Sequence, residues 1–189
     1  MPDQGTLVSN NRKQPFKQWR VNLLSTLNML TTLVQSFSVG FLDVAKVLGL
    51  HFSIDKASAG PGVRASSSCA AALIGVVGEN LSGNVIILSD NGAFNEIVST
   101  MSGGAISKPD TSDPMSMSAL GELTNMLCGA ALKEVARAGS GRLDITPPQL
   151  FSGENLKSVP SEGEGIKYFT IPLKSGSGEC FVYIVLGFR

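Results

Sequence analysis

Residues 115–138 read MSMSALGELTNMLCGAALKEVARA, and this stretch predicts a long two-sided helix. At about 100° per residue, one narrow stripe of the helix carries Ser118, Glu122, Asn125 and Gly129. The apolar residues fall on the opposite side: Leu120, Leu123, Leu127, Ala130 and Ala131. We therefore expect the helix to pack its leucines inward. Its outer face then presents one carboxylate and one carboxamide, one turn apart.

Patterns on both sides of this stretch indicate the fold class. An earlier helix is marked by apolar residues at helical spacing: Leu33, Phe37, Phe41, Val44, Ala45 and Leu48. Residues 89–91, Ser-Asp-Asn, can cap a further helix before the long one. The predicted strands are 70–77, 85–88, 143–145, 168–173 and 180–188. This order predicts an α+β domain in which α-helices pack on an antiparallel β-sheet.

The length and composition favour one compact domain with an appendage. The chain has 189 residues, of which 43% are apolar and 16% are charged. That balance supports a sizeable core and argues against a disordered chain. We assign residues 1–31 to an N-terminal extension, partly helical, and residues 32–189 to the domain.

Charge, cysteine and histidine content narrow the function classes. The 15 basic and 15 acidic residues cancel, which gives no reason to expect nucleic acid as a partner. The sequence contains no uninterrupted run of about 20 apolar residues, so we expect no membrane-spanning helix. Cys69, Cys128 and Cys180 are odd in number and widely spaced, which favours a reducing, cytoplasmic setting. His51 is the only histidine, so a catalytic triad or a zinc site would have to form without a second histidine.

An isolated Glu-x-x-Asn pair is commonplace on solvated helices and does not by itself indicate a function. The residues around the pair on the long helix make it more specific. Ser118 stands four residues before Glu122, and twenty-two residues separate Asn125 from Pro148 in the run DITPP. This spacing resembles the signature of the CheC/CheX/FliY phosphatases. The resemblance extends through the runs LIGVVG, GELTNMLCG and SGENL. A single Glu/Asn pair makes the chain more similar to the CheX-type chemotaxis phosphatases than to CheC.

The resemblance implies a CheC-like fold and a phosphatase that hydrolyses the aspartyl phosphate of a CheY-like response regulator. It implies that Asn125 positions the attacking water and that Glu122 docks on the phosphate-facing lysine of the receiver. Ser118 and Pro148 would support the helix and its neighbouring loop. Mg²⁺ would be bound by the receiver, because this chain offers no cluster of metal ligands of its own.

Two further expectations follow from the resemblance. A non-catalytic binding module of the same fold, which docks a receiver or a motor component, is the alternative function, although both motif residues are intact. We also expect a homodimer through the C-terminal strands, because residues 180–188 alternate like a pairing strand. The chain departs from the family pattern in its N-terminal extension and in a polar loop at residues 157–165.

Overall fold

The computed structural model describes residues 14–78, 81–138, 142–157 and 166–189, with side chains from residue 28 onward. The helices are α1 (Gln14–Leu48), α2 (Asn91–Met101) and α3 (Pro114–Arg137). The strands are β1 (Phe52–Ile54), β2 (Gly60–Pro61), β3 (Ser68–Gly78), β4 (Ser82–Ser89), β5 (Leu143–Ile145), β6 (Gln149–Leu156), β7 (Lys167–Ser175) and β8 (Phe181–Phe188). Most of the predicted polar loop and the first part of the predicted extension lie outside the described residues.

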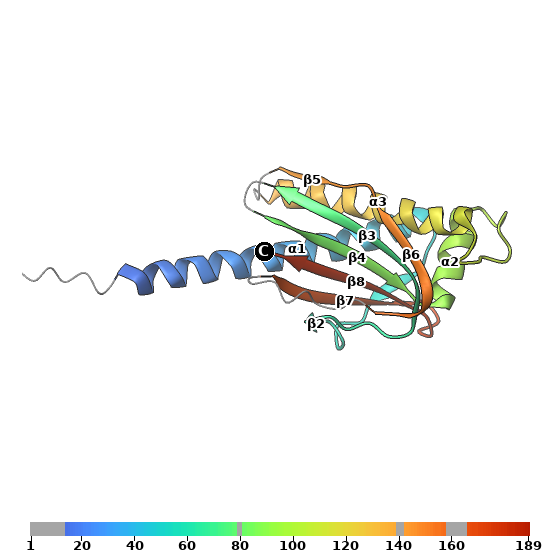
Figure 1. Cartoon of the computed structure of the whole chain (residues 1–189), viewed down its shortest axis with the longest axis horizontal. Coiled ribbons are helices and arrows are strands. Elements are labelled where there is room, and N and C mark those ends of the chain that lie inside the picture. The colour runs from blue at the N-terminus through green and yellow to red at the C-terminus, as the bar shows by residue number, and fades with distance from the viewer. Residues whose placement is uncertain (1–13, 79–80, 139–141, 158–165) are drawn as a thin grey trace, which may run out of the picture.

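The strands form one antiparallel sheet with the order β1-β7-β8-β4-β3-β5 (Figure 1). β2 pairs with β7, and β6 pairs with β3. The hairpin of β3 and β4 runs from the pair Ala70 and Ser89 to the pair Val77 and Ser82. Side chains from the three helices share one buried cluster with alternate residues of these strands. The predicted α+β architecture, with helices on an antiparallel sheet, is therefore confirmed.

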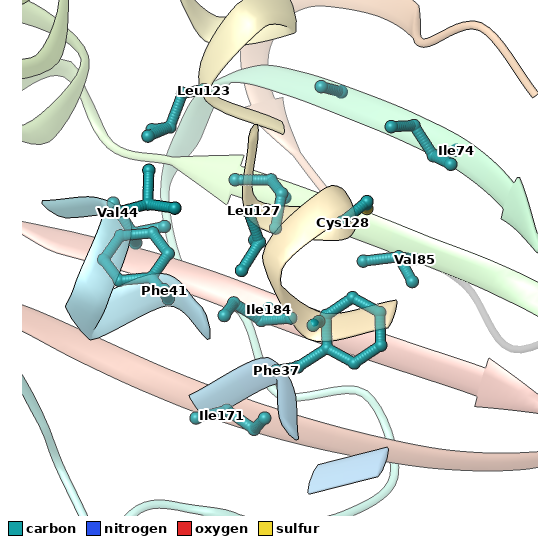
Figure 2. Packing of buried hydrophobic residues seen from close by; sticks show 14 of the residues in the cluster. Phe37, Phe41, Val44, Ile74, Val85, Leu123, Leu127, Cys128, Ile171 and Ile184 are labelled. Atoms are coloured by element: carbon teal, nitrogen blue, oxygen red, sulfur yellow. The ribbon is translucent and has the colours of Figure 1, made fainter. Parts of the chain in front are cut away.

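The core lies between α1, α3 and the covered face of the sheet (Figure 2). Phe37 and Phe41 of α1 are fully buried there, as are Leu123 and Leu127 of α3. The two helices approach so closely that a Cβ atom added at Gly40 would lie 3.0 Å from the backbone nitrogen of Ala131. α3 is therefore held on its leucine side by another helix as well as by the sheet.

The start of α3 is fixed by its N-cap, Asp113. The carboxylate accepts hydrogen bonds from the backbone nitrogens of Met115 at 3.2 Å and Ser116 at 2.9 Å. It also accepts one from the Ser116 hydroxyl at 2.7 Å. These bonds, the one from that hydroxyl above all, hold the pKa of Asp113 below its ordinary value. Pro114 follows at the first helical position, where its missing N–H costs no helix hydrogen bond.

Three strands escape the sequence prediction. β1 and β2 are very short, and β6 carries the mixed sequence QLFSGENL without regular alternation. β6 owes its extended form to pairing with β3, from Leu73 with Gln149 to Ser68 with Leu156. α1 is one continuous helix across the expected boundary between residues 31 and 32, and its N-terminal half extends beyond the sheet in Figure 1.

The C-terminal strand occupies the middle of the sheet rather than an edge. β8 pairs with β4 along one side and with β7 along the other. Since both rows of its backbone groups are already bonded, β8 has no free edge for a second chain. The expected homodimer stays a prediction, and edge-to-edge pairing through residues 180–188 would first require one neighbouring strand to leave.

Candidate functional site

The site begins with the orientation of α3. Leu120, Leu123 and Leu127 are buried, as predicted, and Figure 2 shows Leu123 and Leu127 within the core. On the opposite face Glu122 is exposed and Asn125 is half-buried. The helix therefore brings the carboxylate and the carboxamide to one surface, about 4.5 Å apart along its axis. We expected both side chains to be exposed, and the half-buried Asn125 differs in this respect.

The rest of the stripe leaves open space beside the pair. Ser118 is exposed one turn before Glu122. A Cβ atom added at Gly129 would meet nothing within 4 Å. A partner's surface can therefore approach this part of α3 closely. Ala130, which we placed on the packed side, is only half-buried.

The segment that contains Pro148 is anchored to β3 and leads directly onto α3. Thr146 bonds Gly75 twice: its backbone nitrogen donates to the carbonyl at 2.9 Å, and its Oγ1 accepts from the nitrogen at 2.9 Å. Pro148 then precedes β6, whose Leu150 lies against Gly121 of α3. A Cβ atom added at Gly121 would come within 3.3 Å of Leu150 Cδ2. Pro148 thus stands at the entry to a strand that packs beside the site.

β6 also gives a reason for the unequal exposure of the pair. Gly121 lies four residues before Asn125, so the two share one side of α3. Leu150 covers that side at Gly121, whereas Glu122 lies nearer the open side. The sheet edge therefore flanks Asn125 and leaves Glu122 in solvent.

The polar atoms of the pair are not used within the part of the chain that the structure describes. Among the described residues, the side chains of Glu122 and Asn125 make no hydrogen bond or ion pair. An exposed carboxylate and a carboxamide that can both donate and accept are thus available to a partner.

Other candidate residues lie away from α3's outer stripe. His51 is exposed just after α1, and the described residues include no group of three or more His, Cys, Asp or Glu side chains that could hold a metal ion. Cys69, Cys128 and Cys180 are all free thiols. Burial raises the pKa of the Cys128 thiol to about 12, which suits a packing role in the core. Among the described helices, none combines the length and apolarity needed to cross a membrane.

Two residues beside the site are missing from the sequence prediction. Leu150 lies on β6, which shows no strand periodicity, so the sequence carries no clear signal for it. Met115 belongs to the predicted helix and falls on the same stripe as Glu122, two turns earlier. Helical spacing alone would therefore have been enough to place Met115 on the stripe.

Comparison with known proteins identifies the family of the chain. The family model for "Chemotaxis phosphatase CheX" matches residues 70–173, a range that includes Ser118, Glu122, Asn125 and Pro148. A relative from Thermotoga maritima, "CheY-P phosphatase CheX", is 33% identical over 102 residues, which cover 54% of this chain and 58% of that protein. The match therefore spans little more than half the length of this relative.

Solved structures share the fold over most of the chain. The chemotaxis protein CheX from Vibrio vulnificus has 25% identity and a TM-score of 0.69, over 83% of this chain and 99% of that one. A CheX chain from a CheX-CheY-BeF3-Mg²⁺ complex of Borrelia burgdorferi has 18% identity and a TM-score of 0.62, over 82% and 97% of the two chains. The family match covers more than half of the sequence, and the chain therefore belongs to the CheX family of chemotaxis phosphatases.

Proposed function

We propose that this protein hydrolyses the aspartyl phosphate of a phosphorylated CheY-like response regulator. The observation that carries the proposal is the pairing of Glu122 and Asn125 on one accessible stripe of a helix whose other side is buried. Membership of the CheX family supports the assignment, as does the activity named for the Thermotoga relative. The alternative is a module of the same fold that docks a receiver without turnover.

Asn125 is the residue that we assign to the chemical step. Water attacks phosphorus in line with the bond to the aspartyl oxygen. That bond breaks, its electron pair stays on the carboxylate, and the products are the free aspartate, inorganic phosphate and a proton. Phosphoryl transfer depends mainly on positioning and charge stabilisation, so one well-placed group can contribute much of the rate. The Asn125 carboxamide can accept a hydrogen bond from the water and donate one to its oxygen, which orients the water.

Glu122 is assigned to docking. An exposed carboxylate one helical turn from Asn125 can pair with the receiver's phosphate-facing lysine and set the register of the complex. Mg²⁺ is assigned to the carboxylates of the receiver, in keeping with the presence of CheY, BeF3 and Mg²⁺ in the Borrelia complex.

Ser118 and Pro148 are assigned supporting roles. Ser118 lies on the stripe four residues before Glu122, and Pro148 precedes the strand that carries Leu150 onto α3. The cytoplasmic setting expected from the cysteines suits a protein that acts on a response regulator, and it stays a prediction.

The test is single-turnover loss of the phosphoryl group from a phosphorylated CheY-like receiver. Asn125→Ala should remove the acceleration while binding changes much less, because water positioning acts in the transition state. Glu122→Ala should weaken binding as well as turnover. Asn84→Ala is the matched control, since Asn84 is an exposed carboxamide on β4.

Folding is checked by thermal denaturation, in which Asn125→Ala should change stability by no more than about 0.5 kcal/mol. Hydrolysis by Asn125→Ala at the wild-type rate would remove the catalytic assignment and leave the binding module in its place.

A further inference from the structure

Two exposed apolar side chains lie along the surface of α3 that carries the Glu122–Asn125 pair. Met115 is 70% exposed in the first turn of α3, and Leu150 is 37% exposed on β6. They come from segments far apart in the sequence, yet both lie beside the same helix surface. A partner that docked on this surface would bury apolar area of both side chains, which favours binding.

Leu150 is placed on the Asn125 side of the stripe by two independent contacts. The register of β3 and β6 pairs it with Ala72, a core residue on the helix-covered face of the sheet. Its side chain also lies against Gly121, which has Ser118 three residues before it and Asn125 four residues after it. Residues at these spacings are neighbours on a helix, so Leu150 stands next to the pair.

Met115 lies at the N-terminal end of the same stripe. Its backbone nitrogen donates to the Asp113 carboxylate at 3.2 Å, which fixes the first turn of α3. Seven residues, or two turns, separate it from Glu122, a rise of about 10 Å. Its unbranched, polarizable side chain can adapt to the shape of a partner.

The surface between these residues has little charge. Before Lys133, the sequence of α3 contains one charged residue, Glu122. The neighbouring side chains of Ser118 and Ala119 are small, so Glu122 and Asn125 are the longer polar groups on this part of α3. Apolar contacts around such groups would exclude water from them when a partner docks.

We propose that Met115 and Leu150 form an apolar rim that binds an apolar patch on the phosphorylated receiver, next to its phosphorylation pocket. This inference rests on the proposed function and adds the part of the receiver that the site selects. The rim supplies affinity and water exclusion, whereas Glu122 and Asn125 supply register and chemistry. Receivers with an acidic surface at that place should be poor substrates, because the charged groups beside the rim, Asp113 and Glu122, are both carboxylates.

Phe151 provides a matched control on the same strand. It is 47% exposed, but it pairs with Ala71, which belongs to the cluster on the opposite face of the sheet. Leu150→Gln and Phe151→Gln therefore make the same kind of change at adjacent positions, one beside the site and one away from it.

The experiment measures the Kd for a CheY-like receiver loaded with beryllium fluoride and Mg²⁺, together with KM and kcat for the phosphorylated form. Met115→Gln combined with Leu150→Gln should raise Kd by about tenfold or more. The loss should appear mainly in KM. Phe151→Gln should bind as tightly as wild type, and thermal denaturation checks that every variant is folded.

Three results would overturn the inference. The first is an unchanged Kd in the folded double variant, and the second is an equal loss in Phe151→Gln. The third is a lower oligomeric mass of the free double variant than of the free wild type. That difference would mean that the rim contacts a second copy of this chain. If the wild type binds the loaded receiver through the rim but does not speed hydrolysis, the inference stands and the proposed function fails.

Discussion

Replacing Gly129 by alanine tests whether the outer stripe of α3 faces open solvent. A helix-interior glycine is less favourable than alanine by about 0.8–1 kcal/mol. Since a Cβ atom at Gly129 would meet nothing within 4 Å, no clash offsets that gain. Gly129→Ala should therefore stabilise the fold by about 1 kcal/mol and raise Tm by about 2–4 °C for a chain of this size.

The matched variant is Gly121→Ala on the same helix. Here the new Cβ atom would lie 3.3 Å from Leu150 Cδ2 and 3.4 Å from Cδ1. These atoms end a flexible, partly exposed side chain, which can shift by a few tenths of an ångström at a cost of roughly 0.5–1 kcal/mol. Most of the gain in helix propensity should thus be cancelled, and Tm should rise less than in Gly129→Ala.

Thermal denaturation followed by circular dichroism measures both variants, and receiver binding shows their functional effect. A methyl group at Gly129 lies on the docking stripe, so it should raise the Kd for the loaded receiver even though the fold is more stable. A fall in Tm for Gly129→Ala would refute the reasoning. It would mean that another surface, such as a second copy, covers this stripe in solution.

Three other predictions concern the fold and its assembly. Leu127→Ala, at a fully buried side chain, should cost about 3 kcal/mol and lower Tm by about 6–12 °C in a thermal melt. In the folded protein the pKa of the Asp113 carboxyl is lowered. The Asp113 carboxylate therefore stabilises the fold above the unfolded pKa of about 4, and this stabilisation is lost as the pH falls through the folded pKa. Asp113→Ala should accordingly destabilise the protein at neutral pH, and melts in acid should show the gap closing. Light scattering at micromolar concentration should give a dimer mass, and a monomer mass would contradict the expected homodimer.

Much of the fold could be predicted because its signals are local. The leucine stripe of α3 follows from helical spacing alone, and burial of Leu120, Leu123 and Leu127 confirms it. The cap of α2 follows from a single residue, since Asp90 accepts a hydrogen bond from the backbone nitrogen of Ala93. In each case a side chain interacts within one or two helical turns, so the sequence contains both partners close together.

The candidate site was only partly predictable. Glu122 and Asn125 could be proposed from the sequence because helical spacing places them one turn apart and because the resemblance to the CheX-type phosphatases points to them. Pro148 could be proposed from its spacing to Asn125. The strand β6 that follows it could not be predicted from the sequence. QLFSGENL has no alternation, and its extended form depends on hydrogen bonds to β3, about eighty residues earlier in the chain.

The sequence by itself therefore determined the two-sided helix, the cap of α2 and the polar pair on the outer stripe. Only the tertiary structure decided that Leu150 would cover Gly121 and shield the Asn125 side of the stripe. It also decided that β8 would lie between β4 and β7, with no edge left for a partner. The physical reason is the range of the interactions. Helical faces follow from residues a few positions apart, whereas the order of strands and the packing of a sheet edge on a helix depend on the whole chain.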